Sequence, residues 1–402
     1  MGLMNEYIQK IKSGWKPKNF EDELLRLIKE YNKLRSSYLL VYSSAINSPI
    51  DQKIIMQEDY YIMHDLLKDK SIENLDVYLE TPGGLGEVAE EIVKLLHNKS
   101  QNVSFVISGQ AKSAGTIIAL SGHEIFMTET GSLGPIDAQI RIGRYVFSAH
   151  DYIEWVNKKK RQARKSGKLN HFDAIMVAQI TPGELSGVLH SLRYAEDLVI
   201  EWLPKYKFKN WNVTKDRQIP VTEKMKEKRA KEIATELTKH SRWRTHGRSL
   251  KIQDLLDLGL IINRVEDNPK MADIVYRIQA VTRFLFDMTP TFKIIATADG
   301  KIFRRAQQPQ GFPGGLQIIQ QQQQQQQQPD VVNIEHKCQK CGTINKFFFK
   351  LSENPLIDLE MKKLGIKQFP PDNKYSCKCG ALHDLINLRK QIEANIIKNK
   401  PS

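Results

Sequence analysis

Cysteine is missing from the first 337 residues of this 402-residue chain, and all four cysteines lie in its last quarter. A secreted disulfide framework needs cysteines spread through the fold, so this distribution excludes that class of protein. The chain also lacks a run of about 18 apolar residues, which a membrane-spanning helix would need. The pattern G-x-x-x-x-G-K-S/T, which cradles nucleotide phosphates, does not occur, and this excludes ATP hydrolysis by that route.

The N-terminus has no apolar core of the kind that secretory signal peptides carry. We therefore expect a cytoplasmic protein, with attachment to a membrane surface left open. The net charge is +14, with dense basic runs at 158–168 and 224–231. Such runs bind nucleic acid or anionic lipid in some proteins, but they are more often solvated faces of helices. Because no nucleic-acid motif accompanies them, we do not expect a nucleic-acid partner.

The order of elements along the chain predicts an α/β protein with several parts. Short apolar runs rich in strand formers alternate with helical patterns, which is typical of βαβ units and a mainly parallel sheet. A glutamine run at 320–328 lies in a turn-rich segment with too little apolar surface to fold. We predict an N-terminal helical segment (1–35), an α/β domain (36–290), a linker (291–330), a small cysteine-containing domain (331–392) and a basic tail (393–402).

Two segments of small residues carry the chemistry. The first, TPGG at 81–84, directly follows a predicted strand, and the second, GQAKSAGT at 109–116, lies between a strand and a helix. Ser113 sits where that strand turns into the helix, whose free N–H groups would stabilise developing negative charge. Gly83 and Gly84 can turn their N–H groups into a pocket because no side chain blocks it. With the amide of Ala114, they are candidate donors of an oxyanion hole.

TPGG, followed by AKSAGTIIAL and then by GSLGPIDAQI at 131–140, resembles the serine dehydrogenase proteinase family. That family belongs to the peptidase S49 group within the ClpP/crotonase fold superfamily. The resemblance spans about residues 38–267. It implies a ββα-spiral fold, assembly into a homo-oligomer, and hydrolysis of peptide or protein substrates through an acyl-enzyme on Ser113. Gly83 and Gly84 match the double glycine of the family's oxyanion loop. A separate unfoldase partner stays open.

The base that activates the serine is left open between two residues. ClpP-like enzymes carry a histidine about 25 residues after the serine, and this chain has none there. Signal-peptide-peptidase relatives use a lysine that burial keeps near neutrality, and Lys158 is the candidate at a similar distance. His246 is the other candidate, in a segment similar to the family. Asp137 either orients the base or holds a turn.

Two further functions stay open beside a serine endopeptidase. A non-catalytic oligomeric scaffold on the same fold would bind partners without a working base. A crotonase-type acyl-CoA enzyme would use oxyanion donors without a serine nucleophile, and the Ser-Ala-Gly segment disfavours it.

The C-terminal cysteines form two pairs, Cys338-x-x-Cys341 and Cys377-x-Cys379, each followed by glycine. Four thiolates on such tight turns suit tetrahedral zinc, and we predict a zinc-ribbon-like unit that holds a structural Zn²⁺ and binds a substrate or partner. The shorter C-x-C spacing departs from the usual pattern, and four unrelated cysteines are the alternative. We expect no cofactor for catalysis.

Overall fold

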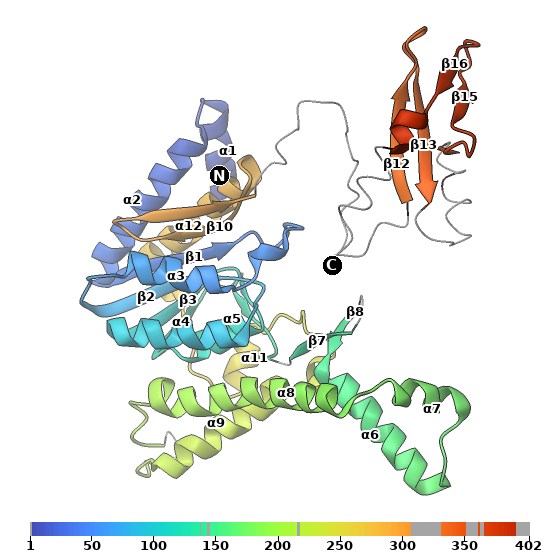
Figure 1. Cartoon of the computed structure of the whole chain (residues 1–402). Coiled ribbons are helices and arrows are strands. Elements are labelled where there is room, and N and C mark those ends of the chain that lie inside the picture. The colour runs from blue at the N-terminus through green and yellow to red at the C-terminus, as the bar shows by residue number, and fades with distance from the viewer. Residues whose placement is uncertain are drawn as a thin grey trace. The chain divides into compact units, whose positions relative to one another are not determined.

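The computed structural model describes residues 2–136, 138–142, 145–214, 218–306, 331–350, 361 and 366–390. The chain divides into two compact units, residues 1–308 and 309–402, and each is described here by itself (Figure 1). The glutamine run at 320–328 and the basic tail at 393–402 lie outside the described residues. Within the described residues, no helix has the length and apolarity needed to cross a membrane.

The first unit is built on a seven-stranded sheet with the order β11-β10-β1-β2-β3-β5-β9. Five strands run parallel, and two antiparallel strands continue the sheet beyond β1. The parallel strands are β1 (Tyr38–Ser44), β2 (Ile72–Glu80), β3 (Ser100–Ile107), β5 (Glu124–Met127) and β9 (Asn263–Arg264). The chain is therefore an α/β protein with a mainly parallel sheet, as predicted.

Strands β10 (Thr291–Ala296) and β11 (Lys301–Arg305) form the antiparallel edge of this sheet. The sequence placed the end of the domain at residue 290, and both strands lie beyond it. They group with the first unit because β10 is buried along its whole length against β1. The other predicted domain limits stay predictions.

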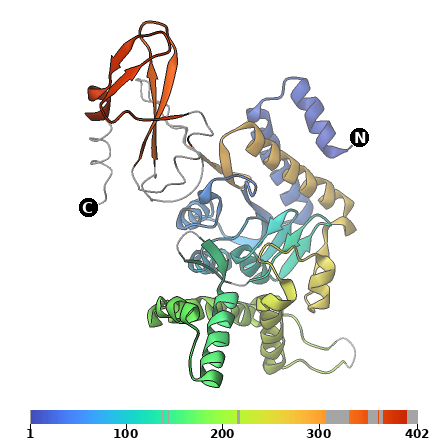
Figure 2. The same ribbon diagram turned by 90° about the vertical axis from the view of Figure 1, so that its right-hand side faces the viewer.

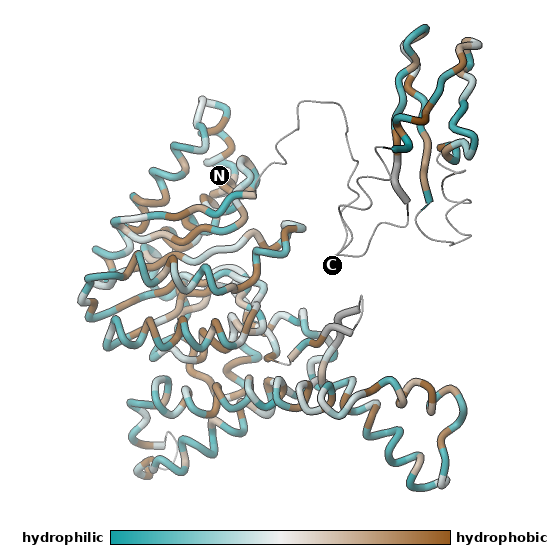
Figure 3. Tube along the Cα trace, viewed as in Figure 1, coloured by the Kyte–Doolittle hydropathy of each residue, from teal (hydrophilic) through white to brown (hydrophobic). Residues whose placement is uncertain are grey.

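Successive residues of a strand point to opposite faces of the sheet. Because the parallel strands are continuously apolar, both faces of the sheet are apolar, and each packs against a core. On β2, Val77 and Leu79 join one core with Ile92 of α4 (Gly86–Lys99) and Ile117 of α5 (Ala114–Leu120). Tyr78, between them, joins the other core. In Figure 3, apolar residues, drawn in brown, recur along the strands and helices of this unit. That second core contains apolar side chains of α1 (Leu3–Lys12), α2 (Pro17–Arg35) and α12 (Pro269–Met288).

A helical layer lies beyond α4 and α5. Helix α8 packs against α5 and α9, and α6 packs against α8, while α6 and α7 extend away from the sheet (Figures 1 and 2). These helices are α6 (Ala149–Ser166), α7 (His171–Ala178), α8 (Pro182–Trp202) and α9 (Glu223–Thr238). A hairpin of β7 (Gln139–Ile142) and β8 (Tyr145–Ser148) precedes them, and a π-helical turn (Leu203–Lys207) follows α8.

The described part of the second unit is a small β structure. Strands β12 (Val331–Lys337) and β13 (Ile344–Lys350) pair antiparallel, and β14 (Lys367–Gln368) adds in parallel. A separate hairpin joins β15 (Lys374–Ser376) to β16 (Leu382–Asp384). The described residues of this unit bury two small clusters, one of Ile334, Phe347, Phe369 and Leu385 and the other of Phe348 and Met361. So small a core usually needs a metal ion or disulfides for stability.

Candidate active site and metal centre

Ser113 lies in a sharp turn between β4 (Gln110–Ala111) and α5. Its backbone has φ 52° and ψ −119°, a conformation that residues with a side chain rarely adopt. Such backbone strain persists only where neighbouring contacts enforce it, and it gathers at functional sites. The side chain is partly exposed, so a substrate has access to the hydroxyl.

The Gly83–Gly84 turn lies directly against Ser113. A Cβ built on Gly83 would lie 2.7 Å from the Ser113 Cβ and 3.4 Å from the Ala114 nitrogen. Both glycines have positive φ, +103° and +157°. The two segments meet because Thr81 exchanges backbone hydrogen bonds with the strand before Ser113: its N–H donates to the Gln110 carbonyl at 2.7 Å and its carbonyl accepts from the Lys112 N–H at 3.0 Å.

The amides around this turn differ in what they bind. The Gly83 N–H donates to the Thr81 hydroxyl at 3.2 Å. The Gly84 and Ala114 N–H groups have no backbone acceptor within the part of the chain that the structure describes. Free N–H groups at such a turn are suited to an oxyanion. Of the three predicted donors, Gly84 and Ala114 are the more available.

The turn is held from its far side by Ile55. The Ile55 N–H donates to the Gly83 carbonyl at 2.8 Å, and the Leu85 N–H donates to the Ile55 carbonyl at 3.1 Å. The segment around Ile55 is fixed in turn by Lys293, whose ammonium binds the Ile54 carbonyl at 2.7 Å and the Asp59 carboxylate at 2.7 Å. Lys293 and Asp59 are both fully buried. A buried ion pair between β10 and α3 (Gln57–Leu66) therefore supports the candidate oxyanion loop.

Lys112, immediately before Ser113, is a site residue that the sequence analysis did not single out. It is buried, and its ammonium donates to the Leu133 carbonyl at 2.8 Å, the Arg248 carbonyl at 3.0 Å and the Ser249 hydroxyl at 2.9 Å. Burial lowers the pKa of Lys112 to about 8, and the charge of Lys251 adds to this. Each of the three ammonium protons is bound to an oxygen, so Lys112 holds the strand-to-helix turn at Ser113 (the serine elbow) in place. The ammonium has no lone pair with which to act as a base. Its partners lie 21, 136 and 137 residues away along the chain, so no local sequence pattern points to this role.

The predicted bases lie in different surroundings. Lys158 is exposed on α6, so its ammonium lacks the burial that a neutral lysine requires. His246 is partly buried in the loop before Leu250. This loop reaches the elbow because Arg248 and Ser249, two and three residues further on, bind Lys112. Asp137 lies outside the described residues.

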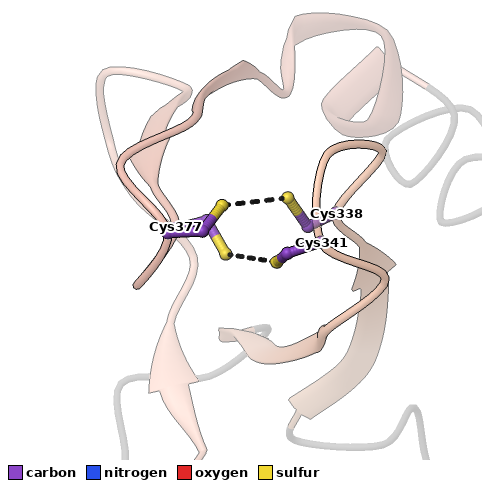
Figure 4. Close-up of side chains that lie close together, drawn as sticks. Cys338, Cys341 and Cys377 are labelled. Atoms are coloured by element: carbon purple, nitrogen blue, oxygen red, sulfur yellow. Dashed lines mark hydrogen bonds between the residues drawn. The ribbon is translucent and has the colours of Figure 1, made fainter.

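The four cysteines of the second unit meet at one point, with sulfur atoms all within 4.8 Å of one another (Figure 4). Cys338 and Cys379 are 3.7 Å apart, and so are Cys341 and Cys377. A disulfide would need about 2.05 Å, whereas sulfurs bound tetrahedrally at about 2.3 Å from one ion lie about 3.8 Å apart. These residues could therefore hold a metal ion.

Residues around the cluster favour this role. Hydrogen bonds from Thr343 lower the pKa of Cys341 to about 6, which favours the thiolate that binds metal. His383 contacts the Cys338 sulfur through Nε2 at 3.2 Å, and its Nδ1 lies 3.2 Å from His336. His383 therefore contacts the cluster directly, and His336 contacts His383 in turn, as outer residues often do around metal ligands.

Residues 45–177 match the family model of the ClpP-like SDH-type serine proteinase. The glycine turn and Ser113 both fall inside this match, so the family resemblance of their motifs is confirmed for this stretch of the chain. Two uncharacterized proteins of Methanocaldococcus jannaschii are 26% and 24% identical to the chain over 245 residues each. The alignments cover 60% of this chain and 71% and 73% of those proteins.

Among solved structures, the chain is similar to two mutants of the 1510-N membrane-bound stomatin-specific protease, one of them in complex with a substrate peptide. The TM-score is 0.30 in both cases, with 14% and 15% identity. The matches cover 55% and 54% of this chain and 79% and 71% of those chains. Similarity at this level does not bear on the chemistry of the present chain.

Proposed function

We propose that this chain, whose residues 45–177 carry the ClpP-like SDH-type serine proteinase domain, hydrolyses peptide bonds through an acyl-enzyme on Ser113. One observation carries the proposal: a partly exposed serine in a strained strand-to-helix turn lies against a turn of two glycines with positive φ. Substrates are peptides or unfolded protein segments, because the hydroxyl must reach a backbone carbonyl.

The proposed reaction follows from the positions of these groups. The Ser113 Oγ attacks the carbonyl carbon of the scissile bond and gives its proton to a base. The carbonyl oxygen becomes negative and accepts hydrogen bonds from the Gly84 and Ala114 amides, with Gly83 shaping the turn. The C–N bond then breaks, and the amine leaves with the proton from the base. Water hydrolyses the acyl-enzyme by the same steps in reverse.

We assign the base to His246 in preference to Lys158. The loop that carries His246 is bound to Lys112, next to the nucleophile, whereas Lys158 is exposed on α6. Replacing a general base lowers the rate by about 10²–10⁴-fold. His246→Gln should therefore slow acylation to that extent, and Lys158→Met should leave it within twofold. The reverse result would assign the base to Lys158.

A fluorophosphonate probe tests the nucleophile directly. The wild-type chain should gain one adduct, which peptide mass spectrometry locates at Ser113, and Ser113→Ala should gain none. Ser191→Ala is the matched control because Ser191 is an exposed serine on α8. A wild-type chain that folds but stays unlabelled would favour the non-catalytic scaffold instead. Binding of acyl-CoA without labelling would favour the crotonase-type enzyme.

For the second unit we propose a structural Zn²⁺ held by Cys338, Cys341, Cys377 and Cys379. The 3.7 Å sulfur separations and the small core support a closed site with no open position for substrate. Purified protein should contain about one zinc per chain, measured by elemental analysis. Cys338→Ala should lose the zinc and leave labelling of Ser113 unchanged. Retention of zinc by that variant would contradict the assignment.

We also propose that the chain assembles with further copies of itself through α7. This helix extends away from the sheet (Figure 1), and its Phe172, Ile175 and Met176 side chains are exposed. Apolar side chains gathered on one exposed helix are typical of an interface. Light scattering coupled to size-exclusion chromatography should report an oligomer that Phe172→Glu dissociates. An oligomer unaffected by Phe172→Glu would place the interface elsewhere.

A further inference from the structure

A cavity of 720 Å³ lies in the first unit at the N-terminal ends of β2, β3 and β5. Ser113 and the glycine turn follow the C-terminal ends of β2 and β3, at the opposite edge of the sheet. The cavity is therefore separate from the candidate active site. Its size falls in the range of sites for small organic ligands, about 300–1,000 Å³.

The floor of the cavity is a polar row that crosses neighbouring strands in register. Asn74 pairs with Asn102 across β2 and β3, and their side-chain amides are hydrogen bonded at 3.1 Å. Two residues further along the strands, Asp76 pairs with Ser104, and Ser104 pairs with Glu124 of β5. Strands buried in a parallel sheet are ordinarily apolar, so the polar row forms a surface that a polar ligand can contact.

One wall of the cavity is aromatic and comes from the segment after α8. The π-helical turn brings Tyr206 and Lys207 to the cavity, and Phe208 and Trp211 follow. Tyr206 stacks on His97 at 3.5 Å, and the rings of Phe208 and Trp211 meet edge to face at 5.6 Å. A π-helical turn is rare and often occurs at functional sites. These rings offer a planar ligand a surface to stack on.

Most charges of the lining are already paired. Asp76 accepts hydrogen bonds from Tyr31, Arg35 and Ser37. Arg229 pairs with Glu232. Glu124 accepts a hydrogen bond from Asn263, and one of its oxygens lies 3.8 Å from Arg35.

Lys207 differs from the other charged groups. Within the described residues it forms no ion pair, and the hydrogen bond it donates is a long one, 3.5 Å, to the His123 carbonyl. Burial lowers the pKa of Lys207 to about 8, with Glu124 acting in the opposite direction. Burial also lowers the pKa of His123, so the imidazole is neutral near pH 7. Among the described residues, the Lys207 ammonium is thus a partly buried cation that lines the cavity and has no carboxylate in direct contact.

We propose that this cavity binds a small organic anion that carries a planar ring, with the anionic group on Lys207 and the ring against Trp211. Two sources share this chemistry: a mononucleotide, and the carboxylate end of a peptide that finishes in an aromatic residue. The Asn74 and Asn102 amides would bind the polar edge of either ligand. The site does not depend on the proposed peptidase activity.

Calorimetric titration of the full chain tests the proposal with two matched pairs of probes. The first pair is AMP and adenosine, and the second is N-acetyl-phenylalanine and its neutral amide. The anionic member of one pair should bind with a Kd of about 1 mM or lower, at least about tenfold tighter than its neutral partner. The pair that binds identifies the source. If neither anion binds up to about 10 mM, the proposal is overturned.

Substitutions of Lys207 distinguish binding in this cavity from weak binding elsewhere on the surface. Lys207→Met should weaken the anionic probe by about tenfold or more, because a charge-assisted hydrogen bond is lost. Lys207→Arg keeps the charge and should retain most of the affinity. Lys209→Met is the matched control, since Lys209 is exposed and does not line the cavity. Equal affinity of wild type and a folded Lys207→Met, checked by circular dichroism, would refute the assignment.

Discussion

The substitution Gly83→Ala tests the arrangement on which the candidate active site depends. A methyl group at this position would lie 2.7 Å from the Ser113 Cβ and 2.8 Å from the Lys112 carbonyl oxygen. Carbon atoms pack at about 3.5–4.0 Å, so the glycine turn and the serine elbow must separate by about 1 Å. A displacement of about 1 Å in a catalytic group can cost about a hundredfold in rate.

Two effects of Gly83→Ala are expected, and they are measured separately. Labelling of Ser113 by a fluorophosphonate should slow by about a hundredfold, because the oxyanion donors no longer face the attacked atom. The free energy of unfolding should fall by only about 1–3 kcal/mol, from the strain of φ +103° and the overpacking. The variant therefore stays folded under the conditions of the labelling assay, which a thermal melt verifies.

Gly187→Ala is the matched control. Gly187 lies on α8, and a Cβ there meets nothing within 4 Å. The same substitution should therefore leave labelling unchanged and favour the helix slightly, since alanine is the better helix former. The reasoning about the site is refuted if Gly83→Ala, folded, labels within twofold of the wild-type rate.

Three further perturbations test the support around the site and the pH response of the fold. Lys112→Met removes three hydrogen bonds at nearly constant side-chain volume. Because the serine elbow is then misplaced, we expect labelling of Ser113 to slow by about a hundredfold. An unchanged rate in the folded variant would contradict the positioning role of Lys112. Lys293→Met removes the ammonium that binds the buried Asp59 carboxylate directly and leaves only the Arg304 guanidinium, 3.8 Å away. The free energy of unfolding should therefore fall by about 3–5 kcal/mol in chemical denaturation; a loss below about 1 kcal/mol would count against it. Burial lowers the pKa of His97 to about 4, so between pH 6.5 and 4 the unfolded chain binds a proton that the folded chain does not. Stability should fall by up to about 3 kcal/mol as the pH drops through this range, and His97→Gln should flatten that dependence in pH-dependent melts; an equally steep dependence in the variant would rule His97 out as its source.

The local sequence pattern was enough to predict the class of fold and the two turns of the candidate active site, one at Gly83 and Gly84 and the other at Ser113. Parallel strands end at the same edge of a sheet, so two turns that follow neighbouring strands were expected to meet there, and Gly83 does lie against Ser113. The paired cysteines were likewise predictable, since turns of two or three residues bring thiolates to one side, and Cys338 and Cys377 do belong to one cluster.

Contacts between residues far apart in the chain were decided only by the tertiary structure. The sequence alone did not indicate that Lys112 is buried, because its partner Arg248 lies 136 residues away. The ion pair between Lys293 and Asp59 spans 234 residues and joins β10 to the support of the glycine turn, past the domain end predicted at 290. The cavity around Lys207 draws its lining from strands and helices along most of the first unit. The periodicity of the sequence specifies which face of a helix or strand is apolar. Packing of the whole chain decides which of these faces contact one another. The sites described above lie at those contacts, so the sequence alone could not place them.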